Sequence, residues 1–476
     1  MKRLITLLLA AGMVLGGAAS SKAIELRATG TWQMGWSWQD TDLQRHGDTT
    51  DTFQARTRIR PQFEFIASEN LQGILQFEIG RNRGTGNAGW GAEHGWAIGT
   101  DGTNVKTRFA YLDWMVPEVN THVRMGLQYA ETPSFTFHTV MGVEMAGVAL
   151  NQSINDWLGV SLAWFRPYND YSLPHDNIDV ALLSVPVTGD GFRVTPWAMT
   201  AFVGKNSLEG LDAVNAADAL SGRTSWGAET SALNSLFPVD YSKSGLPSHH
   251  PFGWWLGVGG ELTLFDPFTL AADFVYGHFD AGHRATGYNV QRKGWIASLL
   301  ATYKLDFMTP GLIAWYASGD DHSMKNGSER LPAIYADSWA TNFGSDGGWY
   351  DAGSLTMDLS GSWGIGLRLD DISFIDDLSH NVRFTYYQGT NNVEMVKKGG
   401  ATSPIYPGRS NGFYLTTSDR AYEFNLENSY QIYKNLTAAF ELGYIYLHLD
   451  KGTWSPMKDD LKNHMYKVGA YLTYKY

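Results

Sequence analysis

Cysteine is absent from this chain of 476 residues. Its absence excludes disulfide bonds, a thiolate nucleophile and a zinc site built on thiolates. Long apolar runs are also missing, because after residue 23 no segment reaches the roughly 18 apolar residues that suggest a membrane-spanning helix. Basic residues are in the minority, with 36 Lys and Arg against 48 Asp and Glu and a formal net charge of -12. A chain with this negative balance is not expected to bind nucleic acid.

The first 23 residues have the pattern of an export signal. Lys2 and Arg3 precede the apolar stretch Leu4–Leu15, and Ser21-Lys22-Ala23 supplies the small residues of a cleavage site. The apolar stretch is too short to span a bilayer as a helix, which takes roughly 20 residues. We therefore predict a signal peptide over residues 1–23. Its removal would take away three basic residues and no acid, which changes the net charge from -12 to -15.

The composition of the chain is apolar in residue type but not in mean hydropathy. Hydrophobic residues make up 43% and aromatic residues 14%, yet the mean hydropathy is -0.24. A membrane β-barrel reconciles these values, because each strand has one apolar and one polar face. A soluble β-protein rich in aromatic residues would have a similar composition, so composition alone does not decide between the two.

Strict alternation of apolar and polar residues decides for the barrel. From residue 24 to residue 39 the even positions are mostly apolar and the odd positions mostly polar, which is longer than most strands of soluble proteins. The last eleven residues repeat the pattern, with Tyr466, Val468, Ala470, Leu472, Tyr474 and Tyr476 on one face. We therefore predict that residues 24–476 form a single antiparallel transmembrane β-barrel in the outer membrane.

Short turns alternate with long polar segments along the chain, as in outer-membrane barrels with extracellular loops. Eight short turns are centred on residues 68–70, 117–120, 155–157, 188–191, 266–268, 308–310, 376–380 and 434–435. They predict nine hairpins and 18 strands, and merging two elements between residues 142 and 188 would give 16. The clearest long segments include residues 130–142 and a predicted long extracellular loop, 204–251. A barrel of 16–18 strands leaves a water-filled lumen.

Basic residues on the strands suggest a charged pore lining. Arg56, Arg58 and Arg60 alternate with Phe53, Ala55, Thr57 and Ile59, so the three arginines should point together into the lumen. Lys106 and Arg108 take the parity opposite to Phe109 and Tyr111, and Arg124 takes the parity opposite to Met125. These side chains would converge on adjacent walls and set ion selectivity. Lumen charges paired with nearby acids, without a narrow constriction, are the alternative.

The overall layout resembles the general porins of Gram-negative bacteria. The export signal, the alternating first strand and the last strand ending in Tyr476 carry this resemblance, and the turn Asn155-Asp156-Trp157-Leu158-Gly159 is similar to the homotrimeric porins of sulfate-reducing bacteria. The resemblance implies a homotrimer in outer-membrane lipid that passes small hydrophilic solutes or ions. It also implies that the loop 130–142 folds inward and presents Glu131 to the basic wall, with Glu144 as a second candidate. Two features depart from the pattern: Tyr replaces the commoner terminal Phe, and 18 strands exceed the 16 of general porins.

We therefore predict a passive outer-membrane porin with no enzymatic activity and no cofactor or metal. A substrate-specific channel is the first alternative, for which an aromatic track along the lumen would be expected, and Tyr387 and Tyr471 are the residues placed to begin one. A barrel enzyme is less well supported, because no strand carries a Ser-x-His pair. An adhesin is also less well supported, because it does not need three arginines in a row on the inward face of one strand. The glycine-rich segment 84–89 lacks the helix of a dinucleotide site, and Asp320-Asp321-His322 lacks a full set of metal ligands.

Overall fold

The computed structural model describes the strands of the chain and part of its loops. The described residues are 24–40, 52–79, 81–82, 86–89, 105–168, 177–204, 250–283, 289–334, 336, 338–340, 359–399, 414–454 and 462–476. The predicted signal peptide, 1–23, and nearly all of the predicted loop 204–251 lie outside them. Among the described residues, no helix has the length and apolar character to cross a membrane.

The described chain is almost entirely β-strand, with one 3-10 turn, η3 (Met324–Asn326), and one short helix, α5 (Val393–Gly399). The long strands are β1 (Glu25–Asp40), β2 (Thr52–Ser68), β3 (Leu71–Ile79), β6 (Val105–Val116), β7 (Thr121–Glu131), β8 (Gly142–Ser153), β9 (Gly159–Tyr168), β10 (Ile178–Ser184), β12 (Phe192–Val203), β13 (Phe252–Phe265), β14 (Phe268–His283), β15 (Asn289–Tyr303), β16 (Thr309–Ala317), β17 (Ser362–Ile375), β18 (Leu378–Gly389), β19 (Arg420–Tyr433), β20 (Leu436–His448) and β21 (His464–Lys475). Three short strands accompany them: β4 (Arg81–Asn82), β5 (Gly86–Gly89) and β11 (Val187–Gly189).

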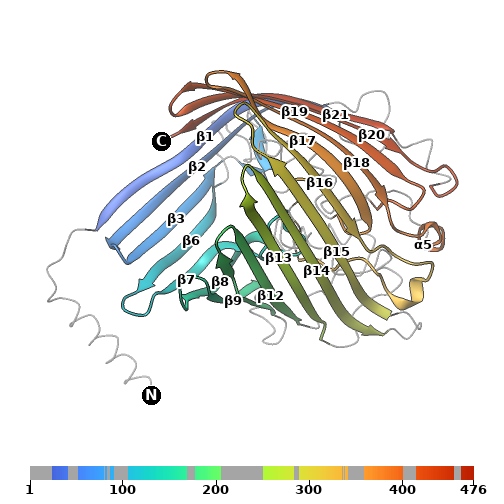
Figure 1. Ribbon diagram of the computed structural model, residues 1–476, viewed down its shortest axis with the longest axis horizontal. Coiled ribbons are helices and arrows are strands. Elements are labelled where there is room, and N and C mark those ends of the chain that lie inside the picture. Colours follow the sequence, from blue (N-terminus) through green and yellow to red (C-terminus); the bar gives the residue numbers. More distant parts are fainter. Residues whose placement is uncertain are drawn as a thin grey trace.

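The long strands close into one antiparallel barrel (Figure 1). Each pairs with its neighbours along the chain, and β21 returns to pair with β1 from Thr31↔Lys475 to Asp40↔Tyr466. The segment that left the strand number open resolves into β8, β9 and β10, with β11 continuing the β10 edge along β12. The prediction of 18 strands is confirmed over the alternative of 16, counted over the described residues.

The eight predicted short turns all join consecutive long strands in the structure. Their residues explain why the chain reverses there, because Asn and Asp tolerate left-handed backbone and their side chains accept bonds from the following amides. Asn120 and Asp377 have φ of 50° and 64°. The side-chain oxygen of Asn155 accepts bonds from the amides of Trp157 and Leu158 at 3.0 and 2.8 Å.

The outer surface of the barrel is a belt of exposed apolar side chains. Trp36, Phe65, Leu112 and Leu256 are all exposed, whereas their neighbours along each strand point inward and are less accessible. Exposing large apolar residues on every strand would be unfavourable in water and is favourable in lipid. The closed barrel and this belt place the chain in the outer membrane, as predicted.

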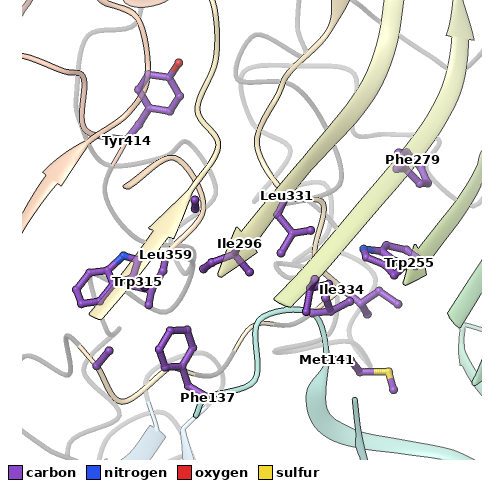
Figure 2. Packing of buried hydrophobic residues seen from close by; sticks show 14 of the residues in the cluster. Phe137, Met141, Trp255, Phe279, Ile296, Trp315, Leu331, Ile334, Leu359 and Tyr414 are labelled. Carbon is purple, nitrogen blue, oxygen red and sulfur yellow. The ribbon is translucent and has the colours of Figure 1, made fainter. Parts of the chain in front are cut away.

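The inner wall of the barrel has two chemically distinct parts. From β8 to β16 the inward residues are mostly apolar, and we call this part the apolar arc. It contains Phe165, Ile178, Val180, Trp197, Met199, Ala201, Trp255, Val275, Phe279, Ile296, Ile313 and Trp315, all buried in one hydrophobic cluster. Figure 2 shows Trp255, Phe279, Ile296 and Trp315 of this set. From β17 through β21 and β1 to β7 the wall is the charged arc, which contains Arg368, Asp370, Arg383, Glu423, Glu427, Glu441, Lys467, Arg56, Arg58, Arg60, Glu78, Lys106, Asp113 and Arg124.

Candidate pore constriction

The upper part of the β7–β8 hairpin leaves the barrel wall. The ladder between β6 and β7 ends at Ala110↔Leu127, and the ladder between β8 and β9 ends at Gly147↔Phe165. Beyond these points β7 and β8 stay paired with each other up to Glu131↔Gly142. Residues 128–146 therefore form an inner hairpin that has separated from both neighbouring strands.

Two glycines lie where the inner hairpin departs. Gly126 and Gly147 are cross-strand partners, and Gly126 has a φ of 130°, a conformation that L side chains rarely adopt. A Cβ atom at Gly126 would overlap the carbonyl oxygen of Ala110, and one at Gly147 would overlap that of Trp164. The buried side-chain amide of Gln128 donates to the carbonyl oxygens of Arg124 and Gly147 at 3.2 and 3.3 Å, which keeps these groups hydrogen-bonded where the ladder ends.

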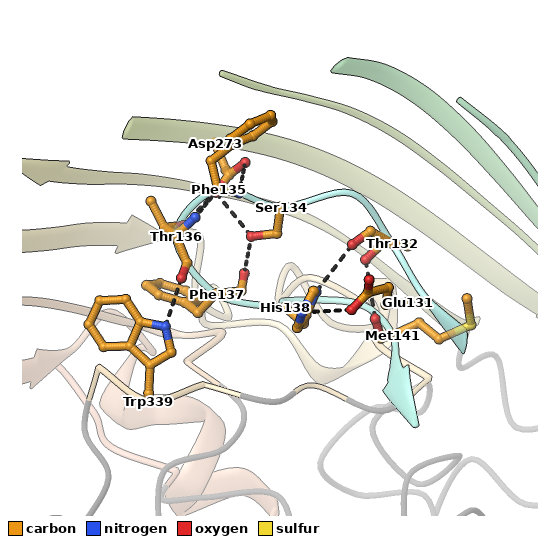
Figure 3. A network of polar contacts seen from close by, with 10 residues as sticks. All are labelled: Glu131, Thr132, Ser134, Phe135, Thr136, Phe137, His138, Met141, Asp273 and Trp339. Atoms are coloured by element: carbon orange, nitrogen blue, oxygen red, sulfur yellow. Dashed lines mark hydrogen bonds and ion pairs between the residues drawn. The ribbon is translucent and has the colours of Figure 1, made fainter. Parts of the chain in front are cut away.

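The tip of the inner hairpin is bound to β14. Asp273 accepts bonds from Ser134 Oγ at 3.1 Å, Phe135 N at 3.0 Å, Thr136 N at 2.7 Å and Thr136 Oγ1 at 2.5 Å (Figure 3). In the wall, β9, β10, β12 and β13 lie between β8 and β14. The hairpin leaves the wall beside β9, and its tip binds to β14 on the far side of these four strands. The hairpin therefore crosses the lumen.

Apolar contacts reinforce the docking of the inner hairpin. Phe137, Val140 and Met141 are fully buried in the cluster that covers the apolar arc (Figure 2). A second loop, between β16 and β17, packs beside them, with Ile334 N donating to Val140 O at 2.8 Å. The indole of Trp339 in this loop donates to Thr136 O at 2.8 Å (Figure 3). Its ring packs edge-to-face with the Phe137 ring, with 6.1 Å between the two ring centres.

The three arginines of β2 lie inward, opposite to the exposed rings of Phe53 and Phe65. Arg56 and Arg58 are only 3% and 5% exposed. The Arg58 guanidinium donates to Gln33 Oε1 on β1 at 2.9 and 2.5 Å, and Arg60 forms an ion pair with Glu78 on β3 at 2.6 Å. The arginines are thus held against the wall by neighbouring strands, rather than extended into solvent.

The predicted face of Phe109 and Tyr111 is wrong, because β6 contains a β-bulge. The β3–β6 register passes from Gln76↔Phe109 to Phe77↔Thr107, which leaves Arg108 as the extra residue. As a result Lys106 pairs with the buried Glu78, while Tyr111 pairs with the buried Ile74, so Lys106 and Tyr111 lie on the same inward face. A single-residue bulge shifts alternation by one, which period-two reasoning does not detect.

Two of the remaining predicted basic residues, Arg108 and Arg124, form ion pairs with acids. Arg108 forms an ion pair at 2.6 Å with Glu144 on the inner hairpin. Arg124 pairs with Asp113 at 3.0 Å, and its guanidinium lies 4.8 Å from the centre of the Tyr111 ring. The structure therefore brings the predicted cations to neighbouring strands but places Arg60, Arg108 and Arg124 in separate ion pairs.

Glu131, which the resemblance assigned to face the basic wall, contacts its own loop. Its carboxylate is 52% exposed and pairs with His138 at 3.2 Å. The acid of the inner hairpin that reaches a basic residue of β6 is Glu144, the second candidate. Two further residues of the site, Asp273 and Trp339, were not predicted from the sequence. Asp273 carries one recognisable signal, because it is a lone acid in the apolar run Leu270–Tyr276 of β14.

Trp339 connects the loops to the charged arc. The guanidinium of Arg368 lies 3.9 Å from the centre of its ring, within the range of a cation–π contact. Arg368 also pairs with Asp370 at 2.8 Å, and Arg383 lies 3.6 Å from both Asp370 and Glu427. Cations, acids and an aromatic ring are thus grouped beside the docked hairpin.

The weaker sequence motifs have structural roles where the structure describes them. Asp320 is buried and accepts bonds from Ser328 Oγ, Glu329 N and Tyr414 Oη at 2.5, 3.0 and 2.7 Å. Across the described part of the chain, no three His, Asp or Glu residues are grouped to hold a metal ion. In the glycine-rich segment, residues 86–89 form β5, which pairs with β4 and β2.

Solved structures from Acinetobacter baumannii and Pseudomonas aeruginosa have a similar fold. OccAB2 from Acinetobacter baumannii is 9% identical with a TM-score of 0.53, covering 95% of this chain and 98% of that chain. OccAB4 from the same species is 10% identical with a TM-score of 0.52, covering 96% and 99%. OccK11 (OpdR) from Pseudomonas aeruginosa is 12% identical with a TM-score of 0.50, covering 94% and 95%. The chain shares their fold. Comparison with family models and with curated protein sequences gives no match.

Proposed function

We propose that this protein is a substrate-specific outer-membrane channel whose constriction is formed by the inner hairpin. The observation that carries the proposal is the hairpin bound across the lumen to Asp273 on β14. The hairpin and the neighbouring β16–β17 loop pack against the apolar arc, which leaves the charged arc to line the passage. A solute would then cross between the partly exposed Arg60 of β2 and the ion pairs of β17 and β18.

Three features favour the specific channel over the general porin that the sequence first suggested. The barrel has 18 strands rather than 16, and two inward loops meet at one level of the lumen. Aromatic rings also lie beside cations, as Tyr111 does beside Arg124 and Trp339 beside Arg368. Such pairs offer both a charge and a flat apolar surface to a solute, which a passive sieve does not need.

The solute that fits this lining is small, hydrophilic and negatively charged at one end. Arg60, Arg108 and Arg124 keep side chains that are 21%, 24% and 33% exposed, and positive charges close together raise the local concentration of anions. On the resemblance to homotrimeric porins, we also propose that three copies associate in the outer membrane.

Planar-bilayer recording tests the channel and its specificity together. We expect a salt gradient to give a reversal potential that favours anions. We also expect benzoate to reduce the current in a saturable way, whereas benzyl alcohol, a neutral molecule of similar size, should not. Ohmic current that neither solute reduces would support the general porin instead. Absence of any conductance from a correctly folded barrel would contradict both.

A further inference from the structure

We propose that the inner hairpin, residues 128–146, is a hinged element whose position is set by Asp273, so that this residue of the wall controls the width of the constriction. The inference rests on the proposed channel function and extends it to the residues that position the constriction. Asp273 acts through the hairpin and need not contact the solute.

The hinge follows from the end points of the strand ladders. Pairing with β6 and with β9 stops at the same level of the hairpin, at Leu127 and Gly147. Beyond this level, in the described part of the chain, the hairpin has only its own strand ladder. It can therefore move as a unit about the residues where the ladders stop when its contacts with β14 and with the β16–β17 loop are released. Gly126 and Gly147 face each other at that level, and neither position has room for a side chain. The geometry thus concentrates the bend in one cross-strand pair.

We call the hydrogen bonds between Asp273 and the hairpin residues 134–136 the latch. The latch places a carboxylate in apolar surroundings. Asp273 lies in β14 between inward residues of the apolar arc, and its near neighbour on that face, Val275, belongs to the hydrophobic cluster. A buried carboxylate there is unfavourable unless its oxygens are hydrogen-bonded. The inner hairpin supplies the donors, two from backbone amides and two from hydroxyls. Docking of the hairpin and burial of this charge therefore stabilise each other.

Ser298 on β15 extends the latch. Its hydroxyl lies 2.7 Å from Thr136 Oγ1, so Thr136 is bound by two adjacent strands of the wall. A hydrogen bond to a charged acceptor is stronger than a neutral one, and each lost bond shifts an equilibrium by about tenfold or more. Thr136→Val should weaken the latch least, because the backbone donors remain. Asp273→Asn should weaken it more, and Asp273→Ala most.

A single spin label can report the position of the hairpin, because the chain has no cysteine of its own. We would introduce Thr139→Cys, attach a nitroxide and record its mobility in the full-length barrel. Otherwise wild-type protein should give an immobilised spectrum. The mobile fraction should rise through Thr136→Val, Asp273→Asn and Asp273→Ala, with current noise and mean conductance rising in the same order. Heat modifiability on a gel would verify that each variant is folded.

Glu441→Gln is the matched control, since it also removes one buried acid of the inner wall but lies on β20 in the charged arc. It should leave the spectrum of the label unchanged. If folded Asp273→Ala gives the spectrum of the wild type, the latch is wrong. If the label becomes mobile and conductance does not change, the hairpin does not set the width. If Asp273→Ala does not fold, the spectra of Asp273→Asn and Thr136→Val test the latch instead, and an unchanged spectrum in both would contradict it. A wild type without conductance would overturn the channel, while the label would still test the hinge.

Discussion

The apolar arc and the charged arc are built from the same kind of alternating strand but differ in how their inward side chains contribute to stability. On the apolar arc, inward side chains are buried in the same cluster as residues of the two inward loops, and the indole of Trp255 donates to Pro332 O of the β16–β17 loop at 2.7 Å. Burial of a large apolar side chain contributes about 1.5–3 kcal/mol, so this arc stabilises the folded loops. On the charged arc, the side chains of the Arg368–Asp370 pair are only 14% and 18% exposed, and the cost of removing both ions from water offsets much of their attraction, so such pairs add little net stability. The apolar arc therefore stabilises the inward loops, whereas we expect the charged arc to set the selectivity of the channel.

Two residues, Asp273 and Trp339, connect the two arcs. Asp273 is an acid within the apolar arc, and Trp339 is an aromatic ring held against the charged arc. Both contact Thr136, through its donors and its carbonyl oxygen respectively. The position of the inner hairpin is therefore sensitive to both arcs, which suggests where substitutions should have effects of different size.

The largest effect should come from opening the seam of the barrel, which lies in the charged arc. Deleting residues 466–476 removes nearly all of β21 and leaves β1 and β20 with unpaired edges. Unpaired backbone groups in lipid cost several kcal/mol each, so we expect no assembled barrel. Heat modifiability and membrane fractionation would measure this. Lys475→Gln, which keeps the strand, should assemble normally. Membrane insertion of the truncated chain would contradict the observed closure.

The next largest effect should come from the apolar arc. Phe137→Ala removes a fully buried ring from the docked hairpin and should cost about 3–5 kcal/mol of docking free energy. The barrel itself should survive, because its ladders do not depend on this ring. Hydrogen exchange of residues 132–141 should accelerate. Phe384→Ala, on the exposed face of β18, is the matched control and should leave that exchange unchanged. Equal acceleration in both variants would show that the arcs are not independent.

The architecture of the barrel could be predicted from the sequence because it depends on local patterns. Alternation identifies the strands, and turn residues such as Asn155 and Asp377 identify where they reverse. The strand number then follows by counting. The constriction could not be predicted in the same way. The bulge at Arg108 shifts the alternation of β6, and the contact between Asp273 and Thr136 joins residues far apart in the sequence. Neither leaves a periodic signal.

The glycine pair at the hinge is an intermediate case. Gly126 and Gly147 are visible as interruptions of strands β7 and β8, but glycine is common throughout the chain, with 52 residues. Only the register shows that these two face each other and that the neighbouring ladders stop beside them. For the same reason Glu131 was the first choice of acid from the resemblance, whereas the observed ion pair across the gap involves Glu144.

A smaller effect, on selectivity rather than folding, should come from the charged arc. Arg58→Glu changes the local charge by two units, so the reversal potential at low salt should move toward cations. The change should shrink at about 1 M salt, where the Debye length is roughly 3 Å. Because Arg58 is buried against Gln33, we also expect a stability loss of about 1–3 kcal/mol. Arg58→Lys keeps the charge and should retain the wild-type reversal potential. An unchanged potential in Arg58→Glu would place the constriction elsewhere.

The smallest effect should be a pH dependence in the stability of the β16–β17 loop, which covers the apolar arc. Burial, with added repulsion from Asp320 and Asp321, raises the pKa of Glu329 to about 7. Its carboxylate accepts bonds from Asp321 N and from Asn326 Nδ2, both at 3.0 Å. Because this pKa is above the usual value of 4.5, the folded loop binds the proton more tightly than the unfolded loop. The stabilisation is complete below about pH 4.5 and is lost as the pH rises through about 7.

Hydrogen exchange of residues 318–334 at pH 5 and pH 8, corrected for intrinsic rates, should therefore show weaker protection at the higher pH. Glu329→Gln should remove most of this difference, because the amide cannot ionise. Glu118→Gln, in the turn between β6 and β7 at the opposite end of the barrel, is the matched control and should retain it. If the pH dependence persists in Glu329→Gln, another group is responsible. The cover of the apolar arc would then be set by its packing alone, with no contribution from the charge of this carboxyl group.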